Sequence, residues 1–266
     1  MNILVTGGTS GLGYELVLKL LGNGHNVTAI GRTLKKIPVS QSNFNFVKAD
    51  FSDLHATTLA INGLMNQNPG YDVIINNAGV LSPQSFTLTT DGLEHSFQVN
   101  FLANMLTDIL VISQSSDNKP VRVISITSPV WRHVRPSFRL PDPGRYRMFR
   151  VYSETKYYQV ISGYLLNRLL PGKTVIFAAF DPGTFRSGIS RMQKKWFRML
   201  YKIASPLMTD PSEIAGVLAH LACTDPFPEG TVVNRKGRKK DDIVLPSATI
   251  LNDFSGLCNG LLTRYT

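Results

Sequence analysis

Cysteine is scarce in this chain of 266 residues, which contains only Cys223 and Cys258. Two cysteines without metal-ligand spacing are too few for a disulfide framework, and they favour a reducing, cytoplasmic setting. Long apolar runs are absent too. No stretch of about 18 apolar residues occurs, so we expect no membrane-spanning helix. The chain reads as a strand from its first residues, so we also expect no signal peptide.

Acidic residues are few as well: Asp and Glu number 18 against 28 Lys and Arg, which gives a net charge of +10. Such a balance is compatible with binding to nucleic acid, to an anionic membrane surface or to an acidic substrate. No nucleic-acid recognition motif accompanies the charge, so we expect no nucleic-acid partner. The five histidines show no spacing typical of a zinc site, and we therefore expect no metal.

Internal repeats, low-complexity tracts and linkers rich in Gly, Ser or Pro are also missing. Hydrophobic residues make up 43% of the chain and charged residues 17%, which allows a large core and excludes general disorder. We therefore expect residues 1–266 to form a single domain.

The sequence does contain a regular alternation of short β-branched runs and longer helical patterns. The predicted strands are Ile3–Thr6, Val27–Ile30, Phe44–Lys48, Val73–Asn76, Val121–Ile126 and Thr174–Ala179. The predicted helices are Leu12–Leu21, Leu54–Met65, Leu93–Ser113, Arg150–Leu170 and Pro211–Cys223. Continuous apolar strands are typical of parallel sheets covered on both faces. The alternation predicts an α/β fold with a doubly wound parallel sheet, although it weakens after about residue 184.

A glycine-rich turn joins the first predicted strand to the first helix. Glycines at such a turn let the backbone approach a pyrophosphate, and the helix N-terminus offers free N–H groups to it. The alternative is a plain strand–turn–helix corner. The residues of the turn that would contact a nucleotide are Thr6, Gly7, Thr9, Ser10, Gly11, Leu12 and Gly13.

Arg32 follows the second predicted strand, at the place where an NAD site would put an acid on the ribose 2′-hydroxyl. A guanidinium there can bind a 2′-phosphate through charge-assisted hydrogen bonds, whereas an acid would repel it. The alternative is a solvated cation in a loop. The pattern favours NADP(H) over NAD(H).

Tyr152 and Lys156 lie four residues apart on a predicted helix, and this spacing puts both on one face. A nearby ammonium favours the phenolate of a tyrosine and lets it act as acid or base near neutral pH. Other polar segments directly follow predicted strands: Asn76–Gly79, Thr127–Ser128 and Asp181–Gly183. The carboxyl ends of parallel strands form the ligand crevice, so these segments should meet at one edge.

Together these motifs resemble the short-chain dehydrogenase/reductase family over nearly the whole chain. Its Thr-Gly-x-x-x-Gly-x-Gly motif matches Thr6–Gly13, its Asn-Asn-Ala-Gly motif matches Asn76–Gly79, and its Tyr-x-x-x-Lys motif matches Tyr152 and Lys156. The resemblance implies a Rossmann-type fold and catalysis by Asn100, Ser128, Tyr152 and Lys156, with Thr127 as the alternative to Ser128. The implied cofactor-binding residues further along the chain are Asp50, Phe51, Asn77, Ala78, Gly79, Tyr152, Lys156, Pro182, Gly183, Thr184 and Ser187.

The mechanism implied by the resemblance is hydride transfer between nicotinamide and a carbonyl or alcohol carbon. Tyr152 would protonate the developing alkoxide and Ser128 would hold the carbonyl oxygen. Lys156 would bind the nicotinamide ribose, and Asn100 would position a water that links Lys156 to solvent. Within the family, the chain looks most like the retinol-dehydrogenase-like branch, although Asp181 stands where Asn or His is more usual.

Two basic segments flank the pocket that the resemblance implies. Residues 131–150 hold six arginines and one acid, and residues 182–209 hold six cations and no acid. The second segment, expected to act as a substrate lid around residues 184–210, is also aromatic. Three interpretations remain open: a solvated lid, a site for an anionic substrate or acidic carrier, and a peripheral contact with an anionic membrane.

The sequence thus predicts an NADP(H)-dependent oxidoreductase that acts on a carbonyl or alcohol substrate of hydrophobic or anionic character. The alternatives are a catalytically idle NADP-binding sensor and an epimerase or dehydratase of the same family. Members of the family often pair through their long helices, here Leu93–Ser113 and Arg150–Leu170. A homodimer or homotetramer is therefore an expectation too, although the positive charge could keep copies apart.

Overall fold

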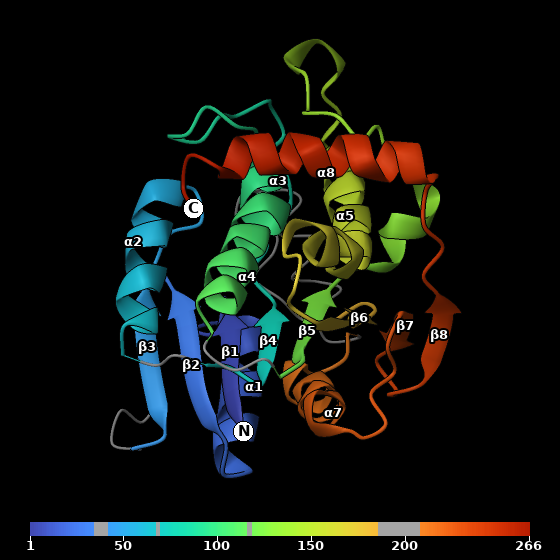
Figure 1. Cartoon of the computed structure of the whole chain (residues 1–266). Helices are drawn as coiled ribbons and strands as arrows, with labels where there is room; N and C mark the ends of the chain where they lie inside the picture. The colour runs from blue at the N-terminus through green and yellow to red at the C-terminus, as the bar shows by residue number, and fades with distance from the viewer. Residues whose placement is uncertain (35–41, 68–69, 116–118, 186–207) are drawn as a thin grey trace.

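The computed structural model describes residues 1–34, 42–67, 70–115, 119–185 and 208–266. Its centre is an eight-stranded sheet with the order β3-β2-β1-β4-β5-β6-β7-β8 (Figure 1). The strands are β1 (Asn2–Thr6), β2 (Asn26–Gly31), β3 (Phe44–Lys48), β4 (Val73–Asn76), β5 (Val121–Ile126), β6 (Val175–Asp181), β7 (Thr231–Asn234) and β8 (Lys239–Asp242). All neighbouring pairs are parallel except β7 and β8. The predicted doubly wound α/β fold is confirmed.

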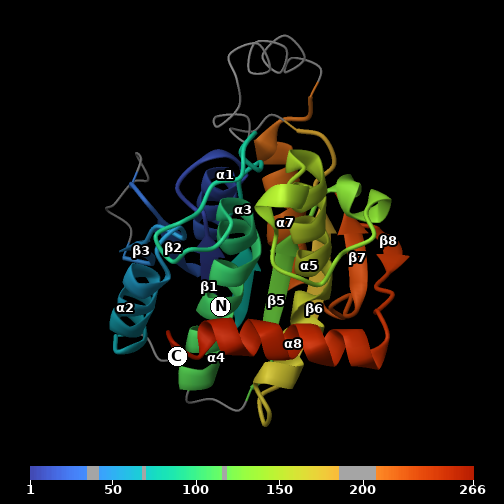
Figure 2. The same ribbon diagram turned by 90° about the horizontal axis from the view of Figure 1, so that it is seen from above.

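Helices cover both faces of the sheet. The helical segments are α1 (Gly11–Gly22), α2 (Leu54–Met65), α3 (His95–Phe97), η1 (Gln98–Leu102), α4 (Ala103–Gln114), η2 (Pro129–His133), η3 (Pro143–Arg145), α5 (Met148–Leu169), α7 (Pro211–Cys223) and α8 (Ala248–Leu262). One core cluster joins the sheet to α2, α4 and α5, and the other joins it to α1 and α7 (Figure 2). α1, α2, α4, α5 and α7 turn their apolar stripes to the sheet, as amphipathic packing requires.

The structure has helix in the region of the long predicted helix Leu93–Ser113, but this helix is not continuous. A short helical turn, α3, leads into a π-helical turn, η1, before regular helix resumes in α4. The amide of Ala103 donates to the carbonyl of Gln98, five residues back, so one extra residue is accommodated in the turn. This turn contains Asn100.

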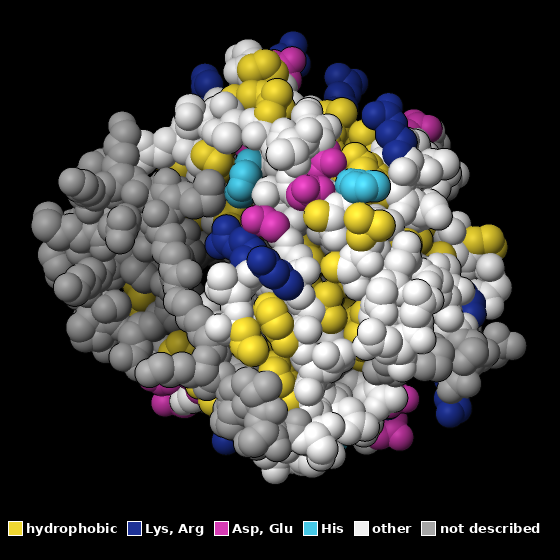
Figure 3. Space-filling model, turned by 90° about the vertical axis from the view of Figure 1, so that its left-hand side faces the viewer, with side chains coloured by type: hydrophobic (Ala, Val, Ile, Leu, Met, Phe, Trp, Pro, Cys, Tyr) yellow, Lys and Arg dark blue, Asp and Glu magenta, His cyan; other side chains and the backbone are white. Residues whose placement is uncertain are grey.

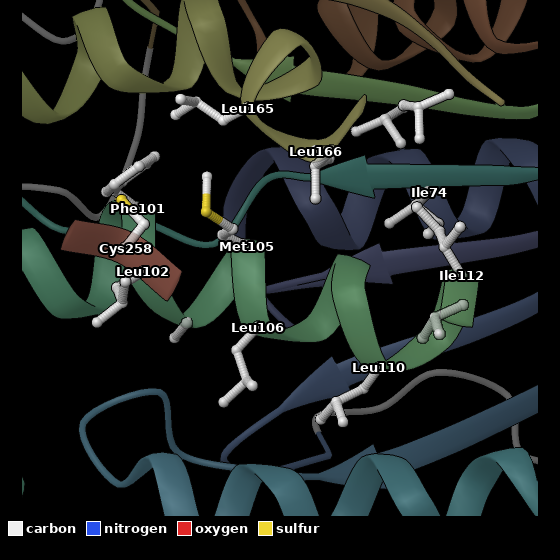
Figure 4. Close-up of a cluster of buried hydrophobic side chains, with 14 of the residues drawn as sticks. Ile74, Phe101, Leu102, Met105, Leu106, Leu110, Ile112, Leu165, Leu166 and Cys258 are labelled. Carbon is white, nitrogen blue, oxygen red and sulfur yellow. The ribbon is translucent and has the colours of Figure 1, made fainter. Parts of the chain in front are cut away.

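The C-terminal helix α8 runs across the outer faces of α4 and α5 (Figures 1 and 2). Phe254 on α8 is fully buried and stacks on Phe101, with 5.7 Å between ring centroids. Cys258 on the same helix is also buried, and Figure 4 shows it beside Phe101 and Leu102. The pattern after residue 184 had indicated neither this helix nor β7 and β8.

One helical stretch, His95–Gln114, is long and apolar enough to span a membrane by length and composition, with a mean hydropathy of 1.2. In this structure 89% of that window is buried inside the protein. Its apolar side chains are thus used in the core.

Candidate active site

The expected edge of the sheet carries the predicted site. In the parallel ladder, Val5 pairs with Ile75, Asn76 with Ser125, and Ile126 with Phe180. The residues that follow these strands therefore lie side by side, as the sequence predicted. This edge also receives the N-terminus of α1, which begins at Gly11.

The glycine-rich turn depends on two left-handed glycines and on one close approach. Gly7 and Gly11 have positive φ angles of 63° and 56°, a conformation that favours glycine. A Cβ on Gly13 would lie 2.3 Å from the carbonyl oxygen of Gly7, so a side chain at this position would push α1 off the turn. A Cβ on Gly11 would meet nothing within 4 Å, because the turn is open on that side.

Three other residues of the turn contribute mainly through their backbone. Ser10 is the N-cap of α1, but its side chain does not cap the helix. Leu12 is buried in the core. The buried Thr9 packs closely against Gly31, where an added Cβ would lie 2.5 Å from the Thr9 hydroxyl. The turn therefore presents peptide groups and a helix N-terminus, the combination that binds phosphate.

A buried hydrogen-bond network fixes the turn to the neighbouring strand. The Thr6 hydroxyl donates to Asn104 Oδ1 (2.7 Å) and accepts from the amides of Asn77 and Ala78, both at 3.0 Å. Asn77 Nδ2 donates to the carbonyls of Thr6 and Gly7 at 3.0 and 3.1 Å. This network orients the predicted cofactor-binding residues at the ends of β1 and β4.

Beyond β2 and β3 lies a group of charged side chains. Arg32 and Asp50 are both exposed, and each is near enough to His95 to affect its pKa electrostatically. Burial is the main cause that lowers the pKa of His95, opposed by Glu94 and Asp50 and supported by Arg32. Phe51 is buried, and its carbonyl accepts from Gln98 Nε2 at 3.0 Å. Figure 3 shows this side of the molecule, where basic, acidic and histidine side chains gather.

Tyr152 and Lys156 lie one turn apart on α5, and both are buried. The Lys156 Nζ is 5.8 Å from the centroid of the Tyr152 ring. Nζ donates to the carbonyl of Ile126 at 2.9 Å and to Gln159 Oε1 at 2.7 Å. Burial lowers the pKa of Lys156 to about 7. A Cβ on Gly79 would lie 3.5 Å from Nζ, so the lysine also reaches the end of β4.

Of the two hydroxyls after β5, the structure favours Ser128 over Thr127 as the group open to a substrate. The Thr127 hydroxyl is buried and donates to the carbonyl of Lys156 at 2.9 Å, which anchors α5 to the sheet. Ser128 is half-buried and is the N-cap residue of η2, with no side-chain cap bond.

Asn100 is fully buried, and both ends of its side chain are engaged. Its Oδ1 accepts from the amide of Val80 at 2.7 Å, and its Nδ2 donates to the carbonyl of Val80 at 2.9 Å. Its own carbonyl accepts from Gln159 Nε2 at 2.8 Å. The expected water that links Lys156 to solvent stays a prediction; the described side chain that joins Lys156 to Asn100 is that of Gln159. Sequence reasoning missed Gln159, for which the only signal was its position three residues after Lys156.

The segment after β6 is held by ion pairs that the sequence did not reveal. Asp181 is buried and pairs with Lys240 at 2.9 Å and Arg132 at 3.5 Å. Arg132 also pairs with Asp241. Asp181 Oδ1 also accepts from the amide of Gly183 at 2.9 Å. Pro182 is buried, and Thr184 is exposed. Ser187, and most of the predicted lid at 184–210, lie outside the described residues.

A cleft of about 340 Å³ opens beside the start of α5, between this helix and the loop after η2. Arg139, Arg145 and Arg150 line it together with Tyr146 and Glu154. Arg150 is paired with Glu154 at 3.3 Å. Within the described part of the chain, no group of three His, Cys, Asp or Glu side chains is placed to hold a metal ion.

A family model described as short chain dehydrogenase matches residues 1–138, more than half of the chain. The chain belongs to this family. Mouse (Mus musculus) retinol dehydrogenase 14 is 28% identical over 270 residues, covering 93% of this chain and 80% of that protein. Human (Homo sapiens) retinol dehydrogenase 12 is 27% identical over 234 residues, which cover 84% of this chain and 73% of that protein.

Among solved structures, a short chain dehydrogenase from Leptospira borgpetersenii with bound NAD+ matches with a TM-score of 0.65 and 21% identity. The match covers 89% of this chain and 91% of that one, and it shows that the fold is shared. As a short chain dehydrogenase, the protein is an oxidoreductase that acts on CH–OH groups and uses a nicotinamide cofactor. The open glycine turn and the uncapped start of α1 fit such a cofactor.

Proposed function

We propose that this short chain dehydrogenase is an NADP(H)-preferring enzyme that interconverts a hydrophobic carbonyl compound and its alcohol. The observation that carries the proposal is the placement of Tyr152 and Lys156, buried together beside the turn that fits a dinucleotide. A purely structural helix would not require a buried lysine, hydrogen-bonded only to neutral groups among the described residues, next to a tyrosine at the ligand edge of the sheet. That placement supports an active enzyme over an idle sensor.

In the proposed reaction, the bound nicotinamide supplies or accepts the hydride. Tyr152 donates a proton to the developing alkoxide, or removes it in the reverse direction, and Ser128 hydrogen-bonds the same oxygen. The Lys156 ammonium stabilises the phenolate form of Tyr152 and binds the ribose. Acid–base assistance of this kind is worth roughly 10²–10⁴-fold in rate.

The preference for NADP(H) is supported by Arg32. Its side chain is exposed directly after β2, the position at which the adenosine ribose lies in this fold. Asp50, the nearest acid that the sequence suggested, follows β3 and already accepts two hydrogen bonds from Ser52, at 3.1 and 2.9 Å. Arg32 is therefore the residue free to face a 2′-phosphate.

A hydrophobic substrate is supported by the aromatic residues around the segment after Ser128. Trp131 and Phe138 both pack on Tyr157, with ring centroids 6.2 and 6.0 Å apart. The related proteins are retinol dehydrogenases, so a retinoid alcohol or aldehyde is the first candidate to test. The arginines of the cleft make an acidic long-chain carbonyl compound the second.

The proposal is tested by measuring NADPH and NADH binding by fluorescence titration, together with cofactor oxidation over a panel of retinoid, aliphatic and acidic carbonyl compounds. We expect NADPH to bind more tightly than NADH. Arg32→Ala should weaken NADPH binding roughly 10-fold or more and leave NADH binding nearly unchanged, because a charge-assisted hydrogen bond is lost.

Arg238→Ala is the matched control, since Arg238 is an exposed arginine on the turn between β7 and β8, at the far edge of the sheet. It should change neither affinity. Equal binding of the two cofactors, or an Arg32→Ala protein that resembles the control, would contradict the cofactor preference. Tight NADPH binding without turnover of any compound would favour the sensor instead.

A further inference from the structure

The buried ammonium of Lys156 has only neutral hydrogen-bond acceptors among the described residues. These are the Ile126 carbonyl at 2.9 Å and Gln159 Oε1 at 2.7 Å. A charged group removed from water needs such acceptors to remain charged. Of the two, only the Gln159 amide belongs to a side chain, so it is the one that substitution can remove.

Gln159 is itself 2% exposed and bridges two elements. It follows Lys156 by three residues on α5, and its Nε2 donates at 2.8 Å to the Asn100 carbonyl in the π-helical turn η1. Asn104 Nδ2 donates to the same carbonyl at 3.0 Å. A carbonyl can only accept and an ammonium can only donate, so the two partners fix which end of the amide faces which.

We propose that Gln159 is a positioning residue of this active site, whose side-chain amide ties the Lys156 ammonium to the backbone of Asn100. The inference rests on the proposed function, because it assigns Gln159 a role through Lys156. Because both ends of the Gln159 amide are hydrogen-bonded and its side chain is buried, it holds Nζ in one place and favours its charged form.

The surroundings add little other charge. From α5 itself, the titratable side chain that faces the ammonium is Tyr152, whose ring centroid is 5.8 Å from Nζ. β5 contributes the neutral Ile126 carbonyl, and burial alone, with no charged group among the described residues, accounts for the lowered pKa of Lys156. Loss of the Gln159 acceptor is therefore not compensated by a nearby carboxylate within the described residues.

The direct test is the pH titration of the Lys156 Nζ by ¹⁵N NMR on the full chain, assigned with Lys156→Met and recorded without cofactor. Gln159→Met keeps the length of the side chain and removes both hydrogen bonds. We expect its Lys156 titration midpoint to fall by about one pH unit or more, which is a tenfold change in proton affinity. The alkaline limb of the pH profile for carbonyl reduction should move in the same direction.

Gln159→Glu provides the rescue. In either protonation state its carboxyl accepts from the ammonium, so the Lys156 midpoint should stay at or above that of the wild type. Ser162→Ala is the matched control, because the Ser162 hydroxyl is also buried and donates at 3.0 Å to the Gln159 carbonyl without contacting Lys156. It should leave the midpoint unchanged.

The inference is overturned if the Lys156 midpoint in Gln159→Met equals that of the wild type. It is also overturned if the Lys156 midpoint in Gln159→Glu lies below that of the wild type. Should Gln159→Met not fold, the Gln159→Glu midpoint still decides. The NMR titration needs no turnover, so a wild-type protein inactive on every carbonyl compound would contradict the proposed function and leave the test of Gln159 intact.

Discussion

Asp108 on α4 lies wholly inside the protein, and its Oδ2 accepts from Asn76 Nδ2 at 2.7 Å. Within the described part of the chain, the other oxygens of this pair, Asp108 Oδ1 and Asn76 Oδ1, have no hydrogen-bond partner. Burial raises the pKa of Asp108 well above its ordinary value of 3.8. A protonated carboxyl could satisfy both groups, since its O–H would donate to the Asn76 carbonyl oxygen.

The raised pKa of Asp108 makes stability depend on pH. Because the folded protein holds this proton more tightly than the unfolded chain, stability should fall as the pH rises from about 4 through the raised pKa. Asp108→Asn supplies the donor permanently. We predict that it raises the free energy of unfolding at neutral pH by about 1–3 kcal/mol and removes that part of the pH dependence. Urea denaturation at several pH values measures both effects.

Asp253→Asn is the control for this prediction, because Asp253 is an exposed acid on α8. It should alter stability little at any pH. An Asp108→Asn protein that is less stable than the wild type at every pH would show that the carboxylate is required in its charged form.

Individual residues could be predicted from the sequence where a functional motif fixes their spacing. Tyr152 and Lys156 could be placed on one helix face from the sequence alone, and the structure has them so. The role of Gln159 and the ion pairs that link Arg132, Asp181 and Lys240 could not be predicted, because these side chains bond to segments distant in sequence. A buried polar side chain has many candidate partners until the fold brings one of them near.

At the scale of elements, strands were the easiest to predict. β1 and β4 are buried on both faces and contain the unbroken apolar runs Ile-Leu-Val and Val-Ile-Ile. β8 has the opposite composition, Lys-Lys-Asp-Asp, because it is an edge strand whose side chains face water. Leu251, Phe254, Cys258 and Leu262 do recur at helical spacing in α8, so that helix could have been found. The interruption of the long helix at η1 has no comparable signal.

Helix α5 is seated on the sheet through Gly163. A Cβ at this position would lie 2.2 Å from both Cβ and Cγ of Phe177 on β6, which cannot move aside without moving the strand. We predict that Gly163→Ala destabilises the protein by about 1–3 kcal/mol through overpacking, despite the better helix propensity of alanine. Chemical denaturation measures the change.

Gly256→Ala is the matched substitution on α8, where an added Cβ meets nothing within 4 Å. At this position only the helix propensity changes, so the free energy of unfolding should rise by about 0.5–1 kcal/mol. If both variants shift stability in the same direction and by similar amounts, the close packing of α5 on β6 is not what Gly163 provides.

For the molecule as a whole, α8 changes the interpretation of the long helices. Pairing of copies through Leu93–Ser113 and Arg150–Leu170 stays a prediction, with the positive charge as the argument against it. The C-terminal segment covers part of that surface: Phe254 packs on Tyr158 with ring centroids 4.6 Å apart, and Arg168 on α5 donates to Asn252 at 3.2 Å. Tyr265 beyond α8 donates to Asp91 at 2.9 Å. Part of the outer surface of α4 and α5 is therefore occupied by the chain's own C-terminal helix (Figures 1 and 2).

The account of the whole molecule depends on a single chemical claim, that Tyr152 is the proton donor of a nicotinamide-dependent oxidoreductase. The most direct measurement is NADPH oxidation with the best substrate of the carbonyl panel, compared between wild type and Tyr152→Phe, with NADPH affinity measured alongside. We predict that turnover falls roughly 10²–10⁴-fold, because the ring is kept and only the proton donor is lost, while NADPH affinity changes little. Turnover within about threefold of the wild type would contradict the assignment.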